Sequence, residues 1–351
     1  MSVQIINADC REALRDMADD SMHCVVTSPP YWGLRDYGHD DAMGLEATVQ
    51  EHVDGMVAVF REVRRVLRSD GTLWLNYGDC YTSGGRATFR SGASENKGHH
   101  VQDDMLCPKT PPGLKPKDLV MLPARIALAL QADGWWLRSD IIWHKPNPMP
   151  ESVTDRPTSA HEHLFLLTKS ASYFYNADAV RETAKYPDDD RPSRASMDHA
   201  RAPTEIMNGI RPRKTDKQRG HSRRHDGFND RWDQMTKAEQ QSMGRNLRNV
   251  WTIATAPFSE AHFATFPPAL IEPCIKAGCP ASGTVLDPFG GAGTTGLVAA
   301  RLGRNAILIE INPEYAAMAR KRIDTDAAKR GTGPVEIMRG DGMPLFGEGA
   351  S

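Results

Sequence analysis

The chain has 351 residues and a mass of 38.8 kDa, which suits one large domain or two ordinary ones. Hydrophobic residues make up 40% and charged residues 25%, a composition that excludes a wholly disordered chain. The 43 basic and 45 acidic residues give a net charge of −2, which as an average argues against a nucleic-acid partner.

Membrane and secretory segments are not expected. No apolar run reaches the roughly 18 residues that a membrane helix needs, and the N-terminus lacks the apolar core of a secretory signal. The six cysteines are scattered without zinc-finger spacing, so neither a disulfide framework nor a metal site is expected. The expected compartment is a reducing cytosol, that of the host cell if the chain is viral.

Short β-branched runs alternate with helical patterns along most of the chain. Seven runs predict strands, at residues 3–7, 23–27, 72–76, 137–143, 163–168, 284–286 and 306–310. Successive apolar residues, as in Ile307-Leu308-Ile309, are typical of strands buried on both faces. Four stretches predict helices, at residues 49–67, 122–132, 294–302 and 313–323. The alternation indicates an α/β sheet with helices on both faces.

Two stretches interrupt this alternation, residues 83–117 and residues 185–250. The second has 15 basic and 10 acidic residues, net +5, which leaves 28 basic and 35 acidic residues, net −7, in the rest of the chain. Only 15 of its 66 residues are apolar, so it supplies little core. It is either a solvated or disordered insertion or a module that binds a polyanion.

A glycine-rich turn at residues 287–295, Asp-Pro-Phe-Gly-Gly-Ala-Gly-Thr-Thr, lies between a predicted strand and a predicted helix. Glycines let a backbone approach a ligand closely, and Glu310, at the end of the next strand, can accept hydrogen bonds from ribose hydroxyls. The order of strand, turn, helix, strand and acid predicts an adenosine-containing ligand. Neither the dinucleotide glycine spacing nor the lysine of a nucleoside-triphosphate loop is present.

A second turn, Ser28-Pro29-Pro30-Tyr31, follows the buried run at residues 23–27. Prolines have no N–H, so this turn presents hydrogen-bond acceptors. Alone it is compatible with an ordinary strand-end turn. It also suits a pocket for the exocyclic amine of a nucleobase, in which Ser28 and the carbonyl of Pro29 accept from the amine and Tyr31 stacks on a base flipped out of the duplex.

Together the two turns resemble the amino-group DNA methyltransferases that use S-adenosylmethionine, whose hallmarks are an [S/N/D]-P-P-[Y/F] motif and an F-x-G-x-G motif. Here the first motif precedes the second by about 260 residues, an order similar to the circularly permuted β class. Residues 6–10 with Leu14, residues 261–271 and residues 310–315 resemble further cofactor motifs of that family. The resemblance implies a Rossmann-like sheet of seven strands.

The resemblance also implies roles for individual residues. Catalytic residues are Ser28, Pro29, Pro30 and Tyr31. Cofactor-binding residues are Asp9, Phe266, Asp287, Pro288, Phe289, Gly291, Gly293, Thr294, Thr295, Glu310 and Asn312. Candidate DNA contacts are Arg211, Arg213, Lys214, Arg219, Arg223 and Arg224. The expected domains are a catalytic half at residues 1–184, a target-recognition insertion at 185–250, a cofactor-binding half at 251–330 and a tail at 331–351.

The expected partner is double-stranded DNA, with no membrane and no metal, and a homodimer stays open. In this family serine at the first motif position usually accompanies methylation of cytosine N4, which is the interpretation adopted here; adenine N6 is the alternative. Three rivals are structured RNA as substrate, a Rossmann-type dehydrogenase and a non-catalytic DNA-binding protein. The permuted order of the motifs disfavours an RNA substrate, and the displaced glycine spacing disfavours a dehydrogenase. The intact motifs disfavour a non-catalytic protein.

Three further segments have open roles. Residues 143–150 with 155–157 form a rigid loop that either borders the base pocket or is only structural, and Lys145 and Arg156 within it are candidates for phosphate contact. His161 and His163 suggest a metal pair, but no further ligands are evident, so a structural role is favoured. Residues 335–341 are an edge strand, a permutation remnant or a tail, and Asp9 is preferred over Asp341 for the cofactor contact.

Overall fold

The computed structural model describes residues 2–33, 43–82, 110, 113–182, 236, 244–256, 265–331 and 336–339, the last four by their backbone alone. Its contacts divide the chain into two compact units, residues 1–179 with 248–351 and residues 180–247. The first unit contains every strand and α-helix described below. In the second, Glu182 and Arg245 exchange two backbone hydrogen bonds of 2.9 Å and form an ion pair of 2.7 Å.

The described part of the chain forms one sheet of nine strands, in the order β6-β4-β5-β3-β2-β7-β8-β1-β9. The strands are β1 (Val3–Asn7), β2 (Met22–Thr27), β3 (Leu67–Tyr77), β4 (Trp136–His144), β5 (His161–Thr168), β6 (Val250–Thr252), β7 (Thr284–Asp287), β8 (Asn305–Ile309) and β9 (Glu336–Arg339). All pairings are parallel except those of β5, which runs antiparallel to both β3 and β4.

All seven predicted strands are present, but the predicted total of seven is wrong for this sheet. Strand β6 was missed because it has only three residues, of which two are exposed, so no apolar run marks it. Strand β9 adds an edge strand beside β1, which resolves the fate of residues 336–339 among the three alternatives. The sheet is therefore mixed and extended at both edges relative to the prediction.

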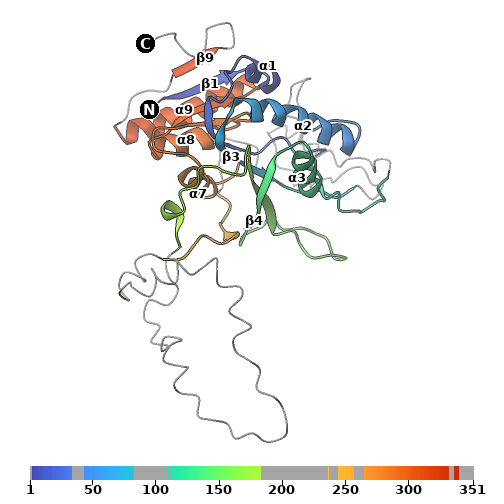
Figure 1. The fold of residues 1–351 in the computed structure, drawn as a ribbon. Coiled ribbons are helices and arrows are strands. Elements are labelled where there is room, and N and C mark those ends of the chain that lie inside the picture. The colour runs from blue at the N-terminus through green and yellow to red at the C-terminus, as the bar shows by residue number, and fades with distance from the viewer. Residues whose placement is uncertain are drawn as a thin grey trace, which may run out of the picture. The chain divides into compact units, whose positions relative to one another are not determined.

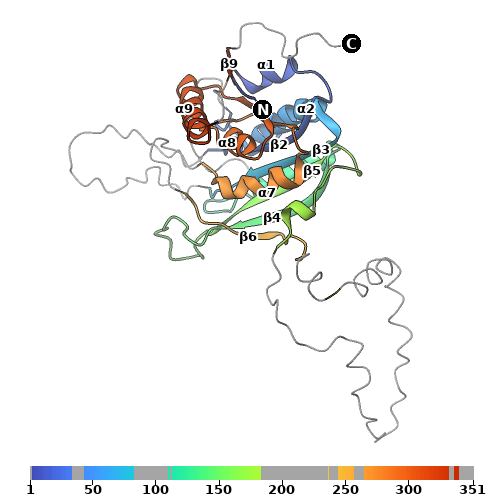
Figure 2. The same cartoon turned by 90° about the vertical axis from the view of Figure 1, so that its left-hand side faces the viewer.

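Helices cover both faces of this sheet, as predicted. They are α1 (Cys10–Arg15), α2 (Val49–Val66), α3 (Leu122–Ala132), α7 (Pro268–Gly278), α8 (Thr294–Arg301) and α9 (Pro313–Lys329), with one short 3₁₀ turn, η1 (Asp178–Val180). Helix α2 packs against α1 and α3, whereas α8 packs against α7 and α9. Figures 1 and 2 show the same two groups, one in blue and green and the other in orange and red. No helix in the described residues is long and apolar enough to cross a membrane.

The alternation of side chains along the strands explains the two layers. In β3, Leu73 and Leu75 belong to the core shared with α1, α2 and α3. Their neighbours Thr72 and Trp74 point to the other face, where they lie against Gly278 of α7. Because successive residues face opposite sides, both faces must be apolar, and the buried runs seen in the sequence follow from that.

One edge of the sheet collects the functional segments. Parallel strands end at the same edge, so the chain segments that follow β1, β2, β3, β4, β7 and β8 meet there. Strand β5 runs the other way and therefore begins at this edge. Turns far apart in the sequence, such as those after Thr27 and Asp287, are brought together by this topology.

Candidate active site

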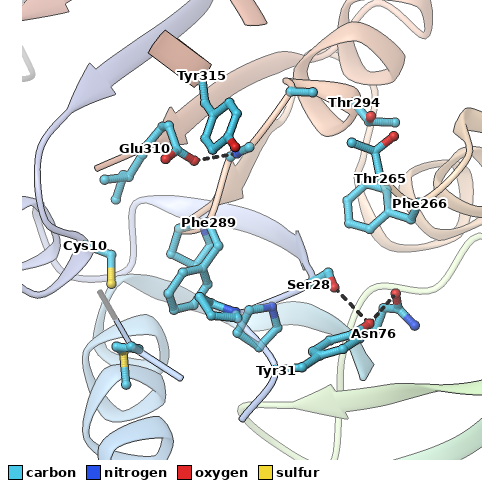
Figure 3. A pocket seen from close by; sticks show the side chains of 18 of the residues that line it. Cys10, Ser28, Tyr31, Asn76, Thr265, Phe266, Phe289, Thr294, Glu310 and Tyr315 are labelled. Atoms are coloured by element: carbon cyan, nitrogen blue, oxygen red, sulfur yellow. Dashed lines mark hydrogen bonds between the residues drawn. The ribbon is translucent and has the colours of Figure 1, made fainter. Parts of the chain in front are cut away.

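A cavity of about 270 Å³ opens at this carboxyl edge. Both sequence motifs line it, the Ser28–Tyr31 turn after β2 and the Phe289–Ala292 stretch after β7. The segment after β1, the start of β5 and the tip of β8 complete much of the wall. Figure 3 shows that Ser28, Tyr31, Phe289 and Glu310 surround one space. The resemblance predicted two motifs, and the fold places them in a single site.

The Ser28–Tyr31 turn is held by a directed chain of hydrogen bonds. The hydroxyl of Ser28 donates to the Tyr31 hydroxyl oxygen over 3.2 Å, and the Tyr31 hydroxyl lies 3.3 Å from Asn76 Oδ1 (Figure 3). The Tyr31 hydroxyl also lies 3.0 Å from Glu162 Oε2. Tyr31 has one proton, which goes to one of these two acceptors, so its oxygen accepts from Ser28. The Ser28 oxygen consequently keeps lone pairs for a donor in the cavity.

Tyr31 stays protonated in this environment. Burial raises the pKa of its phenol well above the usual value, and the nearby Glu162 carboxylate raises it further. The phenol is therefore a permanent hydrogen-bond donor at any pH at which the protein works. Its ring lies 4.8 Å, centroid to centroid, from the ring of Tyr77.

Glu162 is the acceptor at which the hydrogen bonds from Ser28 through Tyr31 end. Its Oε2 also receives a hydrogen bond of 3.1 Å from Asn76 Nδ2, and its Oε1 receives one from Lys145 Nζ. The two charged side chains are only 17% and 19% exposed. The Lys145 ammonium also lies 4.5 Å from the centroid of the Trp143 ring. An ion pair and two neutral donors thus converge on one carboxylate in the cavity wall.

A second, largely buried set of contacts supports the turn from behind. The Tyr77 hydroxyl donates to the carbonyl of Pro30 over 3.2 Å. It also lies 2.5 Å from Nε2 of His52, whose Nδ1 contacts Glu46 Oε2 at 2.8 Å. His52 is completely buried. These contacts fix the backbone of the turn from the side that faces away from the cavity.

Asp287 organises the base of the glycine loop. Its carboxylate is completely buried and accepts hydrogen bonds of 2.6 Å from the hydroxyls of both Thr27 and Thr295, and one of 3.1 Å from the Phe289 amide. Burial raises the pKa of this carboxyl to about 7 against the lowering effect of these donors. Because Thr27 ends β2, Asp287 ties the loop directly to the strand that carries the Ser28–Tyr31 turn.

The loop after Asp287 needs its glycines. Gly291 and Gly293 have φ angles of +49° and +75°, in the left-handed region that favours glycine. A Cβ on Gly293 would come within 2.8 Å of Ala319 Cβ in α9, whereas a Cβ on Gly291 would meet nothing closer than 4.0 Å. Gly293 is therefore required for packing, and Gly291 for the backbone turn in the cavity wall.

Glu310 links the loop to the next strand. Its two carboxylate oxygens accept from the amides of Gly291, over 2.7 Å, and Asn312, over 2.9 Å. Burial raises the pKa of this carboxyl. Each carboxylate oxygen has a second lone pair, so Glu310 can still accept from a ligand hydroxyl. The acid predicted from its position in the sequence does reach the cavity.

The structure divides the predicted cofactor residues into two groups. Those that line the cavity are Asp9, Phe266, Pro288, Phe289, Gly291, Thr294 and Glu310. Four lie outside the cavity lining: Asp287 and Thr295 are buried beneath the loop, Gly293 packs on α9, and Asn312 caps α9 by accepting from the Glu314 amide over 2.8 Å. Direct ligand contact by any of the eleven stays a prediction, and for these four the structure gives a shaping role.

Asn76 and Glu162 line the cavity although the sequence analysis gave them no functional role. Asn76 is a polar residue that directly follows the apolar run Leu73-Trp74-Leu75, and that break in the pattern is its signal. Glu162 was read only as part of a histidine pair with a structural role. His163 does have such a role: its Nδ1 contacts Asp140 at 2.9 Å and its ring stacks on Phe165.

The cavity is bordered by Trp143, near the end of β4, and by Lys145, directly after that strand. Arg156 instead pairs with Glu151 at 2.7 Å and lies 3.9 Å from the centroid of the Tyr81 ring. The six predicted DNA contacts, Arg211, Arg213, Lys214, Arg219, Arg223 and Arg224, lie outside the described residues. Most of the stretch at residues 83–117 lies outside them as well.

Comparisons with known proteins show similarity to DNA methyltransferases. A family model described as DNA methylase matches residues 22–321. Type II methyltransferase M.SmaI of Serratia marcescens is 44% identical over 322 residues, which cover 92% of this chain and 91% of the relative. Type II methyltransferase M.Cfr9I of Citrobacter freundii is 43% identical over 319 residues, which cover 91% of this chain and 87% of the relative.

Solved structures show the same fold. The PvuII DNA methyltransferase (cytosine-N4-specific) matches with a TM-score of 0.55 at 18% identity, over 94% of this chain and 93% of that one. TTHA0409 of Thermus thermophilus, complexed with S-adenosyl-L-methionine, matches with a TM-score of 0.54 at 23% identity, over 96% of this chain and 99% of that one. The family model and the close relatives identify the chain as a member of the N6/N4 amino-group DNA methyltransferase family.

Proposed function

We propose that this protein is a type II DNA methyltransferase that transfers a methyl group from S-adenosylmethionine to N4 of cytosine in double-stranded DNA. The observation that carries the proposal is the shared cavity: the amine-binding turn at Ser28–Tyr31 and the glycine loop with Glu310 face the same space. A donor on one wall and an amine on the other can therefore meet.

The chain's own residues fit the cofactor. Gly290, Gly291 and Ala292 give one wall a nearly bare backbone, and the Glu310 carboxylate stands beside it for ribose hydroxyls. The Phe289 and Phe266 side chains offer apolar surface for an adenine ring. When bound, S-adenosylmethionine supplies an electrophilic methyl group on a sulfonium.

The opposite wall fits an exocyclic amine. Such an amine is a poor nucleophile because its lone pair is delocalised into the ring, so it must be drawn toward tetrahedral geometry by fixed acceptors. The Ser28 oxygen has its own proton committed to Tyr31 and can accept from the amine. Within the described residues no donor occupies the Pro29 carbonyl, the second acceptor that we infer. The amine proton leaves to solvent after transfer.

Cytosine is favoured over adenine by the neutral Ser28 at the first motif position, on the family tendency stated above. Methylation of adenine N6 is the alternative within the same chemistry. We further propose that the chain is circularly permuted, with the catalytic half first and residues 251–330 binding the cofactor. Residues 185–250, with their net charge of +5, would then recognise the DNA target.

A methylation assay tests the proposal. Purified protein is incubated with S-adenosylmethionine and plasmid DNA, the modified nucleoside is identified by mass spectrometry, and the site is mapped by modification-sensitive sequencing. We expect N4-methylcytosine from the wild type. Ser28→Ala should lose most of its turnover while it keeps its affinity for S-adenosylmethionine, measured by calorimetry. N6-methyladenine as the product would select the alternative base, and near-normal turnover of Ser28→Ala would refute the role of this turn.

A further inference from the structure

The ion pair of Lys145 and Glu162 is the one charged feature of the cavity that the proposed chemistry does not use, as far as the described residues extend. Both side chains are largely removed from solvent, at 19% and 17% exposed. A pair in such a place loses much of its hydration, so it is a weak device for stability. Its position in the cavity wall points to a ligand.

Glu162 leaves Lys145 free to donate. The Glu162 carboxylate already accepts hydrogen bonds from Tyr31, Asn76 and Lys145, so its lone pairs are used by residues of the cavity wall. An ammonium has three protons, and one of those on Lys145 goes to Glu162. The other two can be given to acceptors in the cavity. The backbone of Lys145 is fixed by its amide, which donates to the carbonyl of Ala160 over 2.8 Å.

The wall runs from the amine-binding group to this ammonium. Hydrogen bonds of 3.2 Å and 3.0 Å lead from Ser28 to Tyr31 and on to Glu162, and Lys145 is bonded to the far oxygen of the same carboxylate. A base whose amine lies at Ser28 therefore presents the next groups of its Watson–Crick edge toward Lys145. Flipped bases are read along that edge.

The two candidate bases differ at this point. In cytosine the amine is followed by N3 and then the O2 carbonyl, which are both acceptors. In adenine it is followed by N1 and then a C–H, which accepts nothing. An ammonium at this end of the edge donates a hydrogen bond to cytosine. Beside adenine it loses its hydration and gains no hydrogen bond in exchange.

We propose that Lys145, held by Glu162, donates to the O2 side of the target base and is a specificity-determining residue for cytosine. The inference rests on the proposed function, since it assumes an amine bound at Ser28. Glu162 acts as a positioning residue: it orients the ammonium and, through the Tyr31 hydroxyl, the Ser28 oxygen.

The test pairs a protein change with a substrate change. Single-turnover rates are measured for the wild type and for Lys145→Met, on duplexes that contain the mapped site. The target is either cytosine or a C-linked analogue that keeps the amine but has C–H in place of the O2 carbonyl. We expect each single change to slow methylation about tenfold or more, and the double combination to be little slower than either.

The controls separate this role from folding and from general DNA binding. Lys169→Met is the matched variant, because Lys169 is 20% exposed and pairs with Asp20 at the other end of β5. It should keep the full dependence on O2. Lys145→Arg, which keeps a donor, should retain part of that dependence and covers the case in which Lys145→Met does not fold.

The outcomes distinguish the two levels of inference. If Lys145→Met methylates cytosine at the wild-type rate with the wild-type loss on the analogue, or if the wild type methylates the analogue as fast as cytosine, the role of Lys145 is wrong. If Lys145→Met only weakens binding of every duplex and flattens its salt dependence, the residue contacts phosphate and the inference is also overturned. If the wild type forms no N4-methylcytosine, the proposed function itself fails, before any variant is compared.

Discussion

Tyr31 lies directly against Gly78, so closely that a Cβ at Gly78 would come within 2.7 Å of the Tyr31 Cε2 atom. The backbone of Gly78 is not in the left-handed region, so glycine is needed here for space and not for conformation. The residue after β3 thus sets the position of the aromatic ring that we expect to stack on the target base. Real Cβ atoms essentially never make contacts below 3.0 Å, so any side chain at this position moves the ring.

We predict that Gly78→Ala lowers kcat at least tenfold while the affinity for S-adenosylmethionine stays within about threefold, because misplacement by about 1 Å costs up to a hundredfold in rate. The measurement is steady-state methylation together with calorimetric titration of the cofactor. Gly303→Ala is the control: it has φ +72° and no atom within 4 Å of the added Cβ. It should cost about 1–2 kcal/mol of stability, because alanine is strained in the left-handed region, and leave kcat unchanged. Normal kcat for Gly78→Ala would show that the ring position is not critical.

Tyr77→Phe tests the support behind the turn. The substitution keeps the ring beside Tyr31 but removes the hydroxyl that donates to Pro30 and contacts His52. A buried imidazole nitrogen then lacks its partner, so we expect a loss of about 1–3 kcal/mol in the free energy of unfolding and a lower kcat. Urea unfolding and the methylation assay measure the two effects. Tyr175→Phe, at a residue that is 39% exposed, should change neither. Unchanged stability in Tyr77→Phe would contradict the buried contacts.

The sequence was most informative where the physical signal is repeated. Buried strands such as β7 and β8 contain runs of successive apolar residues, and α2 has a continuous apolar stripe, so their existence could be predicted. Helix α1 has only six residues, too few for a periodic pattern. Helix α7 contains Pro273, which breaks the helical signal although the helix continues through it. Tertiary packing decides such cases.

The site was predictable as motifs but not as contacts. Asp287 and Glu310 both lie at the ends of strands next to the glycine loop, and both are predicted from the sequence to bind the cofactor. The structure buries Asp287 among Thr27 and Thr295 and leaves only Glu310 in the cavity wall. Glu162 was missed because β5 is antiparallel, so its first residues, and not its last, reach the carboxyl edge.

Asp287→Asn should alter the pH dependence of stability. The pKa of Asp287 rises from 3.8 to about 7 on folding because of burial, so between these values the folded state holds a proton that the unfolded state has lost. The wild-type free energy of unfolding therefore falls as pH rises through this window, by up to about 4 kcal/mol from this group, and then levels off. The asparagine variant lacks this fall, so it should gain stability relative to the wild type between pH 4 and pH 7.

Urea unfolding at several pH values measures this difference. Asp155→Asn is the control, because Asp155 is exposed beside Lys117 and its pKa is lowered, so its difference from the wild type should stay flat above pH 5. A difference between Asp287→Asn and the wild type that is constant from pH 4 to pH 8 would mean that Asp287 is ionised in the folded state throughout.

The net charge of −2 is the sum of +5 in residues 185–250 and −7 in the rest of the chain. The salt dependence of DNA affinity can show which of these two parts binds DNA. Replacing six of the 15 basic residues of the proposed insertion, Arg211, Arg213, Lys214, Arg219, Arg223 and Arg224, with glutamine should weaken DNA binding. It should also reduce the slope of log affinity against log salt by about 0.9 for each one that contacts a phosphate. The measurement is fluorescence anisotropy of a labelled duplex between 50 and 200 mM salt, values in the range where such contacts dominate affinity.

The matched control neutralises six exposed cations of the first unit, Arg15, Arg61, Arg68, Arg320, Lys321 and Lys329. Surface charges of this kind contribute little to stability, so both proteins should fold and bind S-adenosylmethionine normally. A slope that falls for the insertion variant and not for the control assigns the phosphate contacts to residues 185–250. Equal slopes in the wild type and the insertion variant would place DNA binding on the residues outside 185–250, despite their net charge of −7.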